Sequence, residues 1–433
     1  MKDDLIARSL RHVWHPCTQM KHYLSQPPLA IARADGVWLY DYNGKAYLDA
    51  VSSWWVNLFG HNHPRIKSAL HRQLDTLEHV MLAGLTHAPV VELSERLAQL
   101  AQLPHVFYAS DGASAVEIAL KMSAHYWRQQ GQATKTQFVH LAQSYHDETL
   151  GALGVTDIAL FKQHYTALLM SGTPVTSPDA RLARSGESAE QYALRAADAL
   201  ETYLAQHQHR VAALILEPLV QCATGMGMYH PTYLARARAI CTRYGVLLIA
   251  DEIAVGFGRT GYFFGCEAAQ VVPDMMCLSK GMSGGYLPLA AVLTSADIFA
   301  AFYKDTISQG FLHSHSYTGN PLGCAAALAT LDIFSSEDVI AKNQLKVDDL
   351  AQALADLDLP VEHKRQQGMI VAFDVITNHP HFASRCVKES LARGVLLRPI
   401  GNTVYWMPPY CISREEIKFL AEVTSATVRA ALQ

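Results

Sequence analysis

The sequence predicts an α/β fold in which a large domain with a mostly parallel central sheet is joined to a small α+β domain. Between about residues 106 and 294, short runs that are apolar on both faces alternate with helical segments, as in parallel sheets covered by helices on both sides. Beyond about residue 340, helices and strands follow in the order of a small α+β unit. The 433 residues are 50% hydrophobic, which suffices for the cores of both domains.

The first part of the chain, residues 1–64, is expected to hold an irregular arm and a β-hairpin that belongs to the small domain. The arm runs through Pro27-Pro28, and the apolar runs 37–42 and 46–48 are joined by Asn43-Gly44. Asn-Gly between two such runs predicts a type I′ turn. We expect this hairpin to pack with the C-terminal part of the chain.

Residues 65–335 are expected to form the large domain. A helix is predicted over 87–101, because Pro89 suits a first helical turn and Leu93, Leu97 and Leu100 share one face. The stretch 173–190 is rich in Ser, Gly and Pro, which indicates a surface loop. Buried strands are predicted at 106–109, 137–141, 211–216, 246–250, 275–278 and 289–294, and further helices at 115–127 and 322–334.

Residues 336–433 are expected to complete the small domain. It begins with a helix, and a strand follows at 369–375. A second helix leads to strands at 395–399 and 405–407, and a last helix spans 413–432.

Composition and charge exclude several classes of protein. The net charge of −4 provides no basic surface for a nucleic-acid backbone. The sequence contains no run of 18 or more uncharged apolar residues, so no membrane helix is predicted. The residues Met1-Lys2-Asp3-Asp4 are not those of a secretory signal. The eight cysteines form no CxxC pair, which indicates reduced thiols. The sequence therefore predicts a cytoplasmic protein.

The 21 histidines raise the question of a metal site. His61 and His63 form one HxH pair, and His313 and His315 form another, but neither has a third ligand at a suitable spacing. The HExxH motif is absent. We therefore expect no metal site.

Two of the predicted strands are followed by residues suited to binding a flat, anionic ligand. The small residues at 110–114 lie between a strand and a helix, where backbone N–H groups can bind an anion such as phosphate. Tyr145 follows the next strand, where an aromatic ring can stack on a cofactor. Taken alone, an ordinary helix cap and a core tyrosine explain these two features better.

Two further strand ends carry charge. An apolar run leads directly into Asp251 and Glu252, at the edge where open α/β sheets bind their ligands. Lys280 ends the following run, and an amine in an apolar site is suited to Schiff-base chemistry. A structural salt bridge and a surface lysine are the alternatives at these two positions.

Taken together, the four features fit one cofactor, pyridoxal 5′-phosphate (PLP). A lysine binds its aldehyde carbon, and a carboxylate keeps its ring nitrogen protonated so that the ring can accept electrons. An aromatic side chain stacks on the ring, and a helix N-terminus binds its phosphate. The sequence therefore predicts a PLP-dependent protein.

The motif at 251–261, Asp-Glu-Ile-Ala-Val-Gly-Phe-Gly-Arg-Thr-Gly, together with Lys280, resembles the class III PLP-dependent aminotransferases of fold type I. The resemblance runs from about residue 10 to the C-terminus and is greatest to members that serve biotin biosynthesis. It implies a ping-pong aminotransferase that converts 8-amino-7-oxononanoate to 7,8-diaminononanoate, and a homodimer with shared active sites. Its further motifs are Trp14-His15-Pro16, Ser52-Ser53-Trp54-Trp55, Gly319-Asn320-Pro321, Arg398-Pro399 and the run 405–410.

The resemblance also implies which residues bind the cofactor. Lys280 would hold PLP and move a proton between the donor carbon and the cofactor. Asp251 would pair with the ring nitrogen, and Tyr145 would stack on the ring and face the substrate. The phosphate would be bound by the backbone N–H groups of Gly112 and Ala113 and, from the partner subunit, by His315 and Ser316.

The substrate residues follow from the same resemblance. Trp54 would form a wall of the substrate channel, Ser314 would contact substrate, and Arg398 would bind the carboxylate of the oxo acid. An arginine fork suits that carboxylate, and aromatic walls suit the apolar middle of the nine-carbon chain. Two adjacent aromatic residues on an extended segment point to opposite sides, so Trp55 is expected to be structural.

Three positions depart from the pattern of the class. By the resemblance, Cys17 would lie in the substrate site, where members that use S-adenosylmethionine as amino donor carry a tyrosine. S-adenosylmethionine is the expected donor, and lysine is the alternative. Asp147-Glu148 stand in place of the usual Gly-Asp, and Ala113 in place of a common serine. The alternative functions are another class III ω-amino acid or diamine aminotransferase, a PLP-dependent aminomutase, and a PLP-binding regulatory protein.

Overall fold

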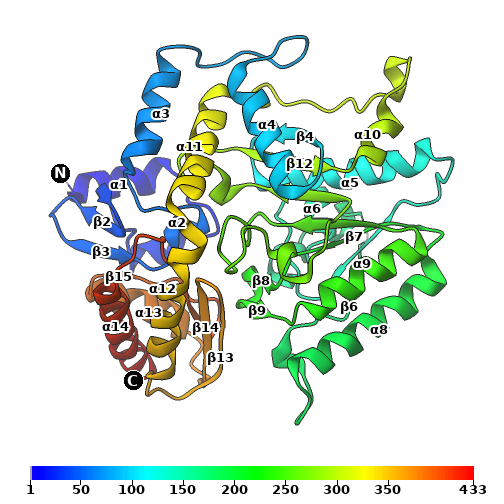
Figure 1. The fold of residues 1–433 in the computed structure, drawn as a ribbon. Coiled ribbons are helices and arrows are strands. Elements are labelled where there is room, and N and C mark those ends of the chain that lie inside the picture. The colour runs from blue at the N-terminus through cyan, green and yellow to red at the C-terminus, as the bar shows by residue number, and fades with distance from the viewer. Residues whose placement is uncertain (1, 171) are drawn as a thin grey trace.

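The computed structural model describes residues 2–170 and 172–433 and has the predicted α/β architecture (Figure 1). Its largest sheet has seven strands in the order β4-β12-β11-β10-β7-β5-β6. The five strands from β11 to β6 are parallel, and β12 is antiparallel to both of its neighbours. The strands are β4 (His105–Ala109), β5 (Gln137–Leu141), β6 (Thr173–Val175), β7 (Val211–Leu216), β10 (Leu247–Asp251), β11 (Met275–Leu278) and β12 (Ala290–Thr294).

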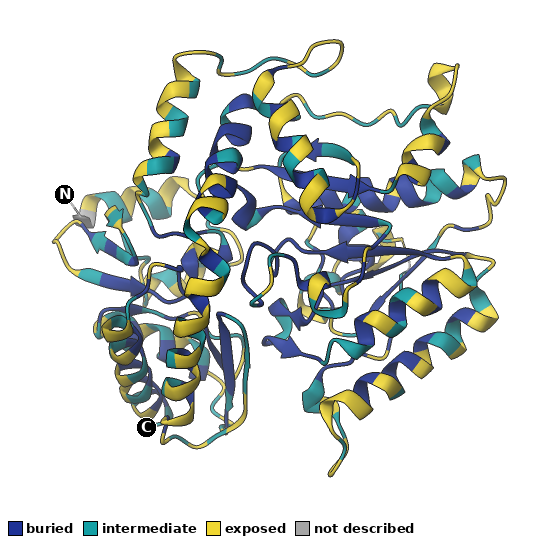
Figure 2. Cartoon of the chain, viewed as in Figure 1, coloured by how far each residue is buried: buried dark blue, intermediate teal, exposed yellow. Residues whose placement is uncertain are grey.

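Helices cover both faces of this sheet, and its strands are buried between them (Figure 2). Leu248 and Ala250 of β10 face one hydrophobic cluster, whereas Leu247 and Ile249 face the other. This alternation follows from the two-residue period of a strand and explains why the strands are apolar on both sides. The first cluster includes α4 (Ala88–Ala101), α8 (Ala189–His207), α9 (Thr232–Tyr244) and α11 (Pro321–Glu337), and the second includes α5 (Gly112–Gln129) and α10 (Ala296–Phe302).

The rest of the chain forms two smaller sheets (Figure 1). In the first, β1 (Ile31–Asp35), β2 (Trp38–Asp41) and β3 (Ala46–Asp49) are joined by β15 (Val395–Leu396), which runs parallel to β3. The N-terminal hairpin and the C-terminal part of the chain therefore share one sheet. The second contains β13 (Val361–Gln367), β14 (Ile370–Val375) and β16 (Thr403–Trp406), and the helices of this region are α12 (Val339–Ala355), α13 (Phe382–Ala392) and α14 (Arg414–Leu432).

Four details differ from the sequence predictions. The expected irregular arm begins with a helix, α1 (Lys2–His12). In the hairpin turn only Gly44 has positive φ (81°), so the predicted type I′ turn, which needs two such residues, is wrong. The expected loop 173–190 contributes β6 to the edge of the large sheet. The strand β13 was not predicted, because its sequence is polar.

The remaining elements are short or peripheral. They are α2 (Ser52–Trp55), α3 (Pro64–Leu74), α6 (Leu150–Gly154), α7 (Ala159–Lys162), β8 (Val220–Gln221) and β9 (Gly227–Met228). All eight cysteines are free thiols. Within residues 2–170 and 172–433, no helix has the length and apolar character needed to cross a membrane. In the same ranges, no three His, Cys, Asp or Glu side chains form a group suited to a metal ion.

Candidate active site

The predicted strand ends meet at one edge of the large sheet. Tyr145 lies shortly after β5, Asp251 is the last residue of β10, and Lys280 lies shortly after β11. These three strands are parallel, so their carboxyl ends lie at the same edge of the sheet. A cavity of about 560 Å³ opens there, and a small adjoining cavity holds Asp251. The larger cavity is lined by Cys17, Trp54, Trp55, Tyr145, Asp147, Glu148, Lys280, Arg398 and Tyr405 together with apolar residues.

Asp251 is the buried acid of the site. Only 5% of it is exposed, and its Oδ2 lies 2.7 Å from Nδ1 of the fully buried His146 side chain. The backbone N–H of Ile253 donates to its other oxygen at 3.1 Å. Nε2 of His146 has no hydrogen-bond partner among the described residues. A carboxylate fixed in this way can hold a protonated ring nitrogen in the cavity.

Lys280 lies two residues after the end of β11, at the start of a short 3-10 helix. Its Nζ is 5.4 Å from the centre of the Trp55 ring, and among the described residues no carboxylate lies within ion-pair distance of it. Its amine therefore faces the cavity without a fixed acidic partner. This leaves the amine available to form a bond to a ligand carbonyl.

Tyr145 is held at both ends. Its backbone N–H donates to Glu217 at 3.1 Å, and its hydroxyl donates to Glu148 at 3.0 Å. Burial, together with the charges of Asp147 and Glu148, raises the pKa of the Tyr145 hydroxyl, so it stays protonated. The ring lies in the wall of both cavities, where it can stack on a flat ligand.

Glu217 is a site residue that the sequence reasoning missed. It follows β7, accepts hydrogen bonds from the backbone N–H groups of Tyr145 and Cys222, and lines the small cavity. Burial raises its pKa to about 7. The signal was the same as for Asp251, since an acid ends an apolar strand at the same sheet edge.

The helix α5 begins with Gly112 and Ala113, and Gly112 packs next to Ile253 and Asp147 of the small cavity's lining. Asp111 caps it by accepting a hydrogen bond from Ser114 N–H at 2.8 Å. The N–H groups of a first helical turn have no partner within the helix and attract anions. A Cβ on Gly112 would lie only 3.2 Å from Ile253, so glycine keeps this end of the helix open.

The segment Ser52–Trp55 has an unexpected conformation. Its four residues have φ values between 47° and 71°, and Trp55 N–H donates to Val51 O at 2.8 Å. They therefore form one left-handed helical turn rather than the expected extended segment. Such a turn is unfavourable for L-residues and persists only where surrounding contacts hold it.

This turn places the two tryptophans differently. Trp55 is buried, donates a hydrogen bond from its indole to the Tyr405 hydroxyl at 3.1 Å, and also borders Lys280. Trp54 is exposed in the larger cavity, with the Arg398 guanidinium 4.3 Å from its ring centre. Trp55 is thus part of the cavity wall as well as of the core, which the sequence analysis did not foresee.

Arg259 stabilises the left-handed turn through buried hydrogen bonds to the backbone. The sequence had assigned no role to this residue. It is 1% exposed and donates to the backbone carbonyls of Pro408 (2.8 Å), Asn57 (2.8 Å) and Trp55 (3.4 Å). These bonds join the chain just after the left-handed turn to the C-terminal part of the protein.

The mouth of the cavity carries Cys17 and Arg398. Cys17 has φ of 52° and an exposed thiol, and Arg398 is also exposed. Ser314, His315 and Ser316 do not line this cavity. They lie in the segment before α11, where His315 Nε2 is 3.1 Å from Nε2 of His313.

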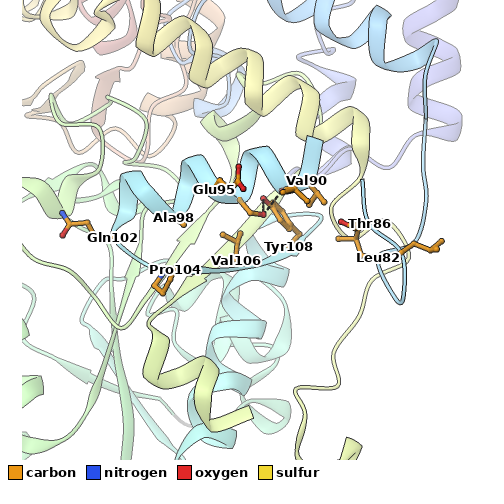
Figure 3. A pocket seen from close by; sticks show the side chains of 12 residues that line it. Leu82, Thr86, Val90, Glu95, Ala98, Gln102, Pro104, Val106 and Tyr108 are labelled. Carbon is orange, nitrogen blue, oxygen red and sulfur yellow. Dashed lines mark hydrogen bonds between the residues drawn. The ribbon is translucent and has the colours of Figure 1, made fainter. Parts of the chain in front are cut away.

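A third cavity, of about 770 Å³, shares no lining residue with the two described above and lies between α4, the segment before it and β4 (Figure 3). Its lining is largely apolar, and Ser94 Oγ and Tyr108 OH form a 2.9 Å hydrogen bond there. Among its described lining residues there is no lysine, arginine, histidine or cysteine. The cavity beside Lys280 is therefore the better candidate for chemistry.

Comparison with known proteins defines the class of the chain. Residues 20–428 match the family Aminotransferase class-III, and the chain belongs to that family. Among solved structures, an ω-transaminase from Pseudomonas jessenii in complex with PMP is similar, with a TM-score of 0.93 at 28% identity over 99% of this chain and 98% of that one.

More specific similarities lie within this family. The adenosylmethionine-8-amino-7-oxononanoate aminotransferase of Helicobacter pylori is 46% identical over 429 residues, 96% of both chains. The crystal structure of the enzyme with that name from Methanocaldococcus jannaschii has a TM-score of 0.93 at 35% identity and covers 99% of both chains.

Proposed function

We propose that the chain is a PLP-dependent aminotransferase that converts 8-amino-7-oxononanoate to 7,8-diaminononanoate, a step of biotin biosynthesis. The observation that carries this proposal is the convergence of Lys280, Asp251 and Tyr145 on the small cavity, with the first residue of α5, Gly112, packed against Ile253 of its lining. The substrate assignment is supported by relatives, 34–46% identical to this chain, that are named adenosylmethionine-8-amino-7-oxononanoate aminotransferase.

The residues of the cavity fit PLP. Asp251 would hold the ring nitrogen, Tyr145 would stack on the ring, and Gly112 and Ala113 would bind the phosphate. When bound, PLP supplies an electron sink that lets the donor carbon lose a proton. The Lys280 amine would hold the cofactor and then carry that proton between the donor carbon and the cofactor.

The same cavity supports the acceptor. The Arg398 guanidinium lies on Trp54 and would bind the carboxylate of 8-amino-7-oxononanoate. Trp54, Trp55 and Tyr405 form a wall suited to the apolar middle of that substrate. Ser314 would contact the substrate.

We also propose that the protein acts in the cytoplasm as a homodimer with shared sites. Because Ser314, His315 and Ser316 lie away from the cavity of their own chain, they would serve the partner's cavity. Light scattering would test this proposal, since a monomeric active enzyme would contradict it. Mixed samples of Lys280→Ala and Ser316→Tyr chains should also recover activity by forming hybrid dimers with one intact site.

The amino donor is tested through the first half-reaction. The protein loaded with PLP is mixed with S-adenosylmethionine and, separately, with lysine, while the cofactor absorbance is followed. We expect conversion by S-adenosylmethionine in spite of Cys17. Conversion by lysine alone would assign lysine as the donor.

A second candidate is an ω-amino acid or diamine aminotransferase. It is favoured by the close fit to solved ω-transaminases, with TM-scores of 0.92–0.94. If neither donor converts the cofactor, but a diamine or an ω-amino acid does, this second function replaces the first.

A further inference from the structure

Asp147 is a strained and charged residue inside the proposed cofactor site. Its φ is 92°, a conformation that L-residues other than asparagine and aspartate rarely adopt. It lines both the larger cavity and the small cavity that holds Asp251. A strained residue that faces a cavity from a fixed backbone is a candidate for a functional role.

The backbone around Asp147 is held by two hydrogen bonds. Its carbonyl accepts one from the Thr156 hydroxyl at 3.0 Å, and its Oδ1 accepts one from Glu148 N–H at 2.8 Å. Its other carboxylate oxygen, Oδ2, lies toward α5. This oxygen lies 3.6 Å from the point that a Cβ on Gly112 would occupy, so it is close to the first residue of α5.

The charges around this carboxylate do not neutralise it. Lys280 favours its charged form, whereas Asp111 and Asp251 oppose it. Within the described ranges, no Lys, Arg or His side chain lies within ion-pair distance of it. Burial is the main cause that raises the pKa of Asp147, with Asp111 and Asp251 adding to it. An anionic ligand group bound at the start of α5 would therefore be repelled by this carboxylate.

We propose that Asp147 weakens the binding of the phosphate group of PLP by placing a carboxylate beside the N-terminus of α5. The inference rests on the proposed function, because it requires the PLP phosphate to bind at Gly112 and Ala113. Asp147 is then a determinant of cofactor affinity.

The test compares two ligands on the cofactor-free full-length chain. PLP and pyridoxal can both react with Lys280, but only PLP carries a phosphate. Dissociation constants are measured from the absorbance of the lysine-bound ligand and, independently, from quenching of tryptophan fluorescence. Asp147→Asn removes the charge and keeps the shape, whereas Asp147→Gly also removes the backbone strain.

We expect both variants to lower the dissociation constant for PLP by about tenfold or more, as removal of a like charge a few ångströms away should do in a half-buried site. The dissociation constant for pyridoxal should change much less. Asp157→Asn is a matched control, because this carboxylate lies on the same segment but does not line the cavities. It should leave both constants unchanged.

Three results would overturn the proposal. The first is an unchanged PLP affinity in Asp147→Asn, and the second is an equal gain in affinity for PLP and pyridoxal. The third is tighter PLP binding in the glycine variant alone, which would assign the effect to backbone strain. The proposed function fails separately if the wild type and every variant form no lysine-bound species with either ligand.

Discussion

Replacing Arg398 by alanine should impair the acceptor half-reaction far more than the donor half-reaction. A hydrogen bond between charged groups contributes about 1.5–3 kcal/mol. Arg398 is exposed at the cavity mouth, where water screens the interaction, so the lower end of this range applies. Since about 1.4 kcal/mol corresponds to a factor of ten, we expect about a tenfold loss of kcat/KM for 8-amino-7-oxononanoate.

The assay separates the two half-reactions by single-turnover absorbance measurements. Arg398→Lys is the matched variant, because it keeps the charge but loses the planar contact with the Trp54 ring, which lies 4.3 Å from the guanidinium. It should show an intermediate loss. An acceptor whose carboxylate is esterified should react poorly with the wild type and be insensitive to Arg398→Ala. Equal losses in both half-reactions would refute the assignment of a dedicated carboxylate site.

The other predictions concern the cofactor lysine, a closely packed glycine and a buried acid. Lys280→Ala should abolish turnover and the absorbance of lysine-bound PLP, and normal turnover in this variant would exclude the proposed mechanism. Gly285→Ala should destabilise the protein by about 2 kcal/mol or more, because its φ is 87° and the new Cβ would lie 2.9 Å from backbone atoms of Val56 and Asn57. Gly186→Ala, at φ of 80° in open space, is the control for thermal unfolding and should lose less. For Glu217, burial raises the pKa to about 7 in the folded chain from 4.5 in the unfolded chain, so its stabilising contribution is complete below the lower value and is lost as pH rises through the higher one. Glu217→Gln should therefore flatten the fall of the melting temperature between about pH 4.5 and 7, and an unchanged slope would contradict this reasoning.

Much of the large sheet and the centre of the site could be predicted because both depend on short, strong patterns. The run 211–216 is wholly apolar and fully buried as β7. Asp251 and Lys280 end such runs, and the rule that ligands bind at the carboxyl edge of a parallel sheet places them together. Glu217 directly follows the apolar strand β7, so the same rule could have predicted it as a site residue.

Other features depend on contacts that have no local signal. The strand β13 is polar and is specified by its backbone pairing with β14, and α1 carries only a few apolar residues. The left-handed turn Ser52–Trp55 contains no glycine, so nothing in its own sequence predicts positive φ. It is held by distant groups, among them Arg259, which is more than 200 positions away in the chain.

The pairing of β3 with β15 affects how the chain folds during synthesis. The two strands are about 350 residues apart, and β3 has its other neighbour, β2, from the start. At about 5–20 residues per second, the ribosome would need roughly 20–70 s to deliver β15 after β3 has emerged. For that time one edge of the N-terminal hairpin has no native partner and can pair with another nascent chain. Efficient production of this protein should therefore depend on chaperones that shield the hairpin early in translation.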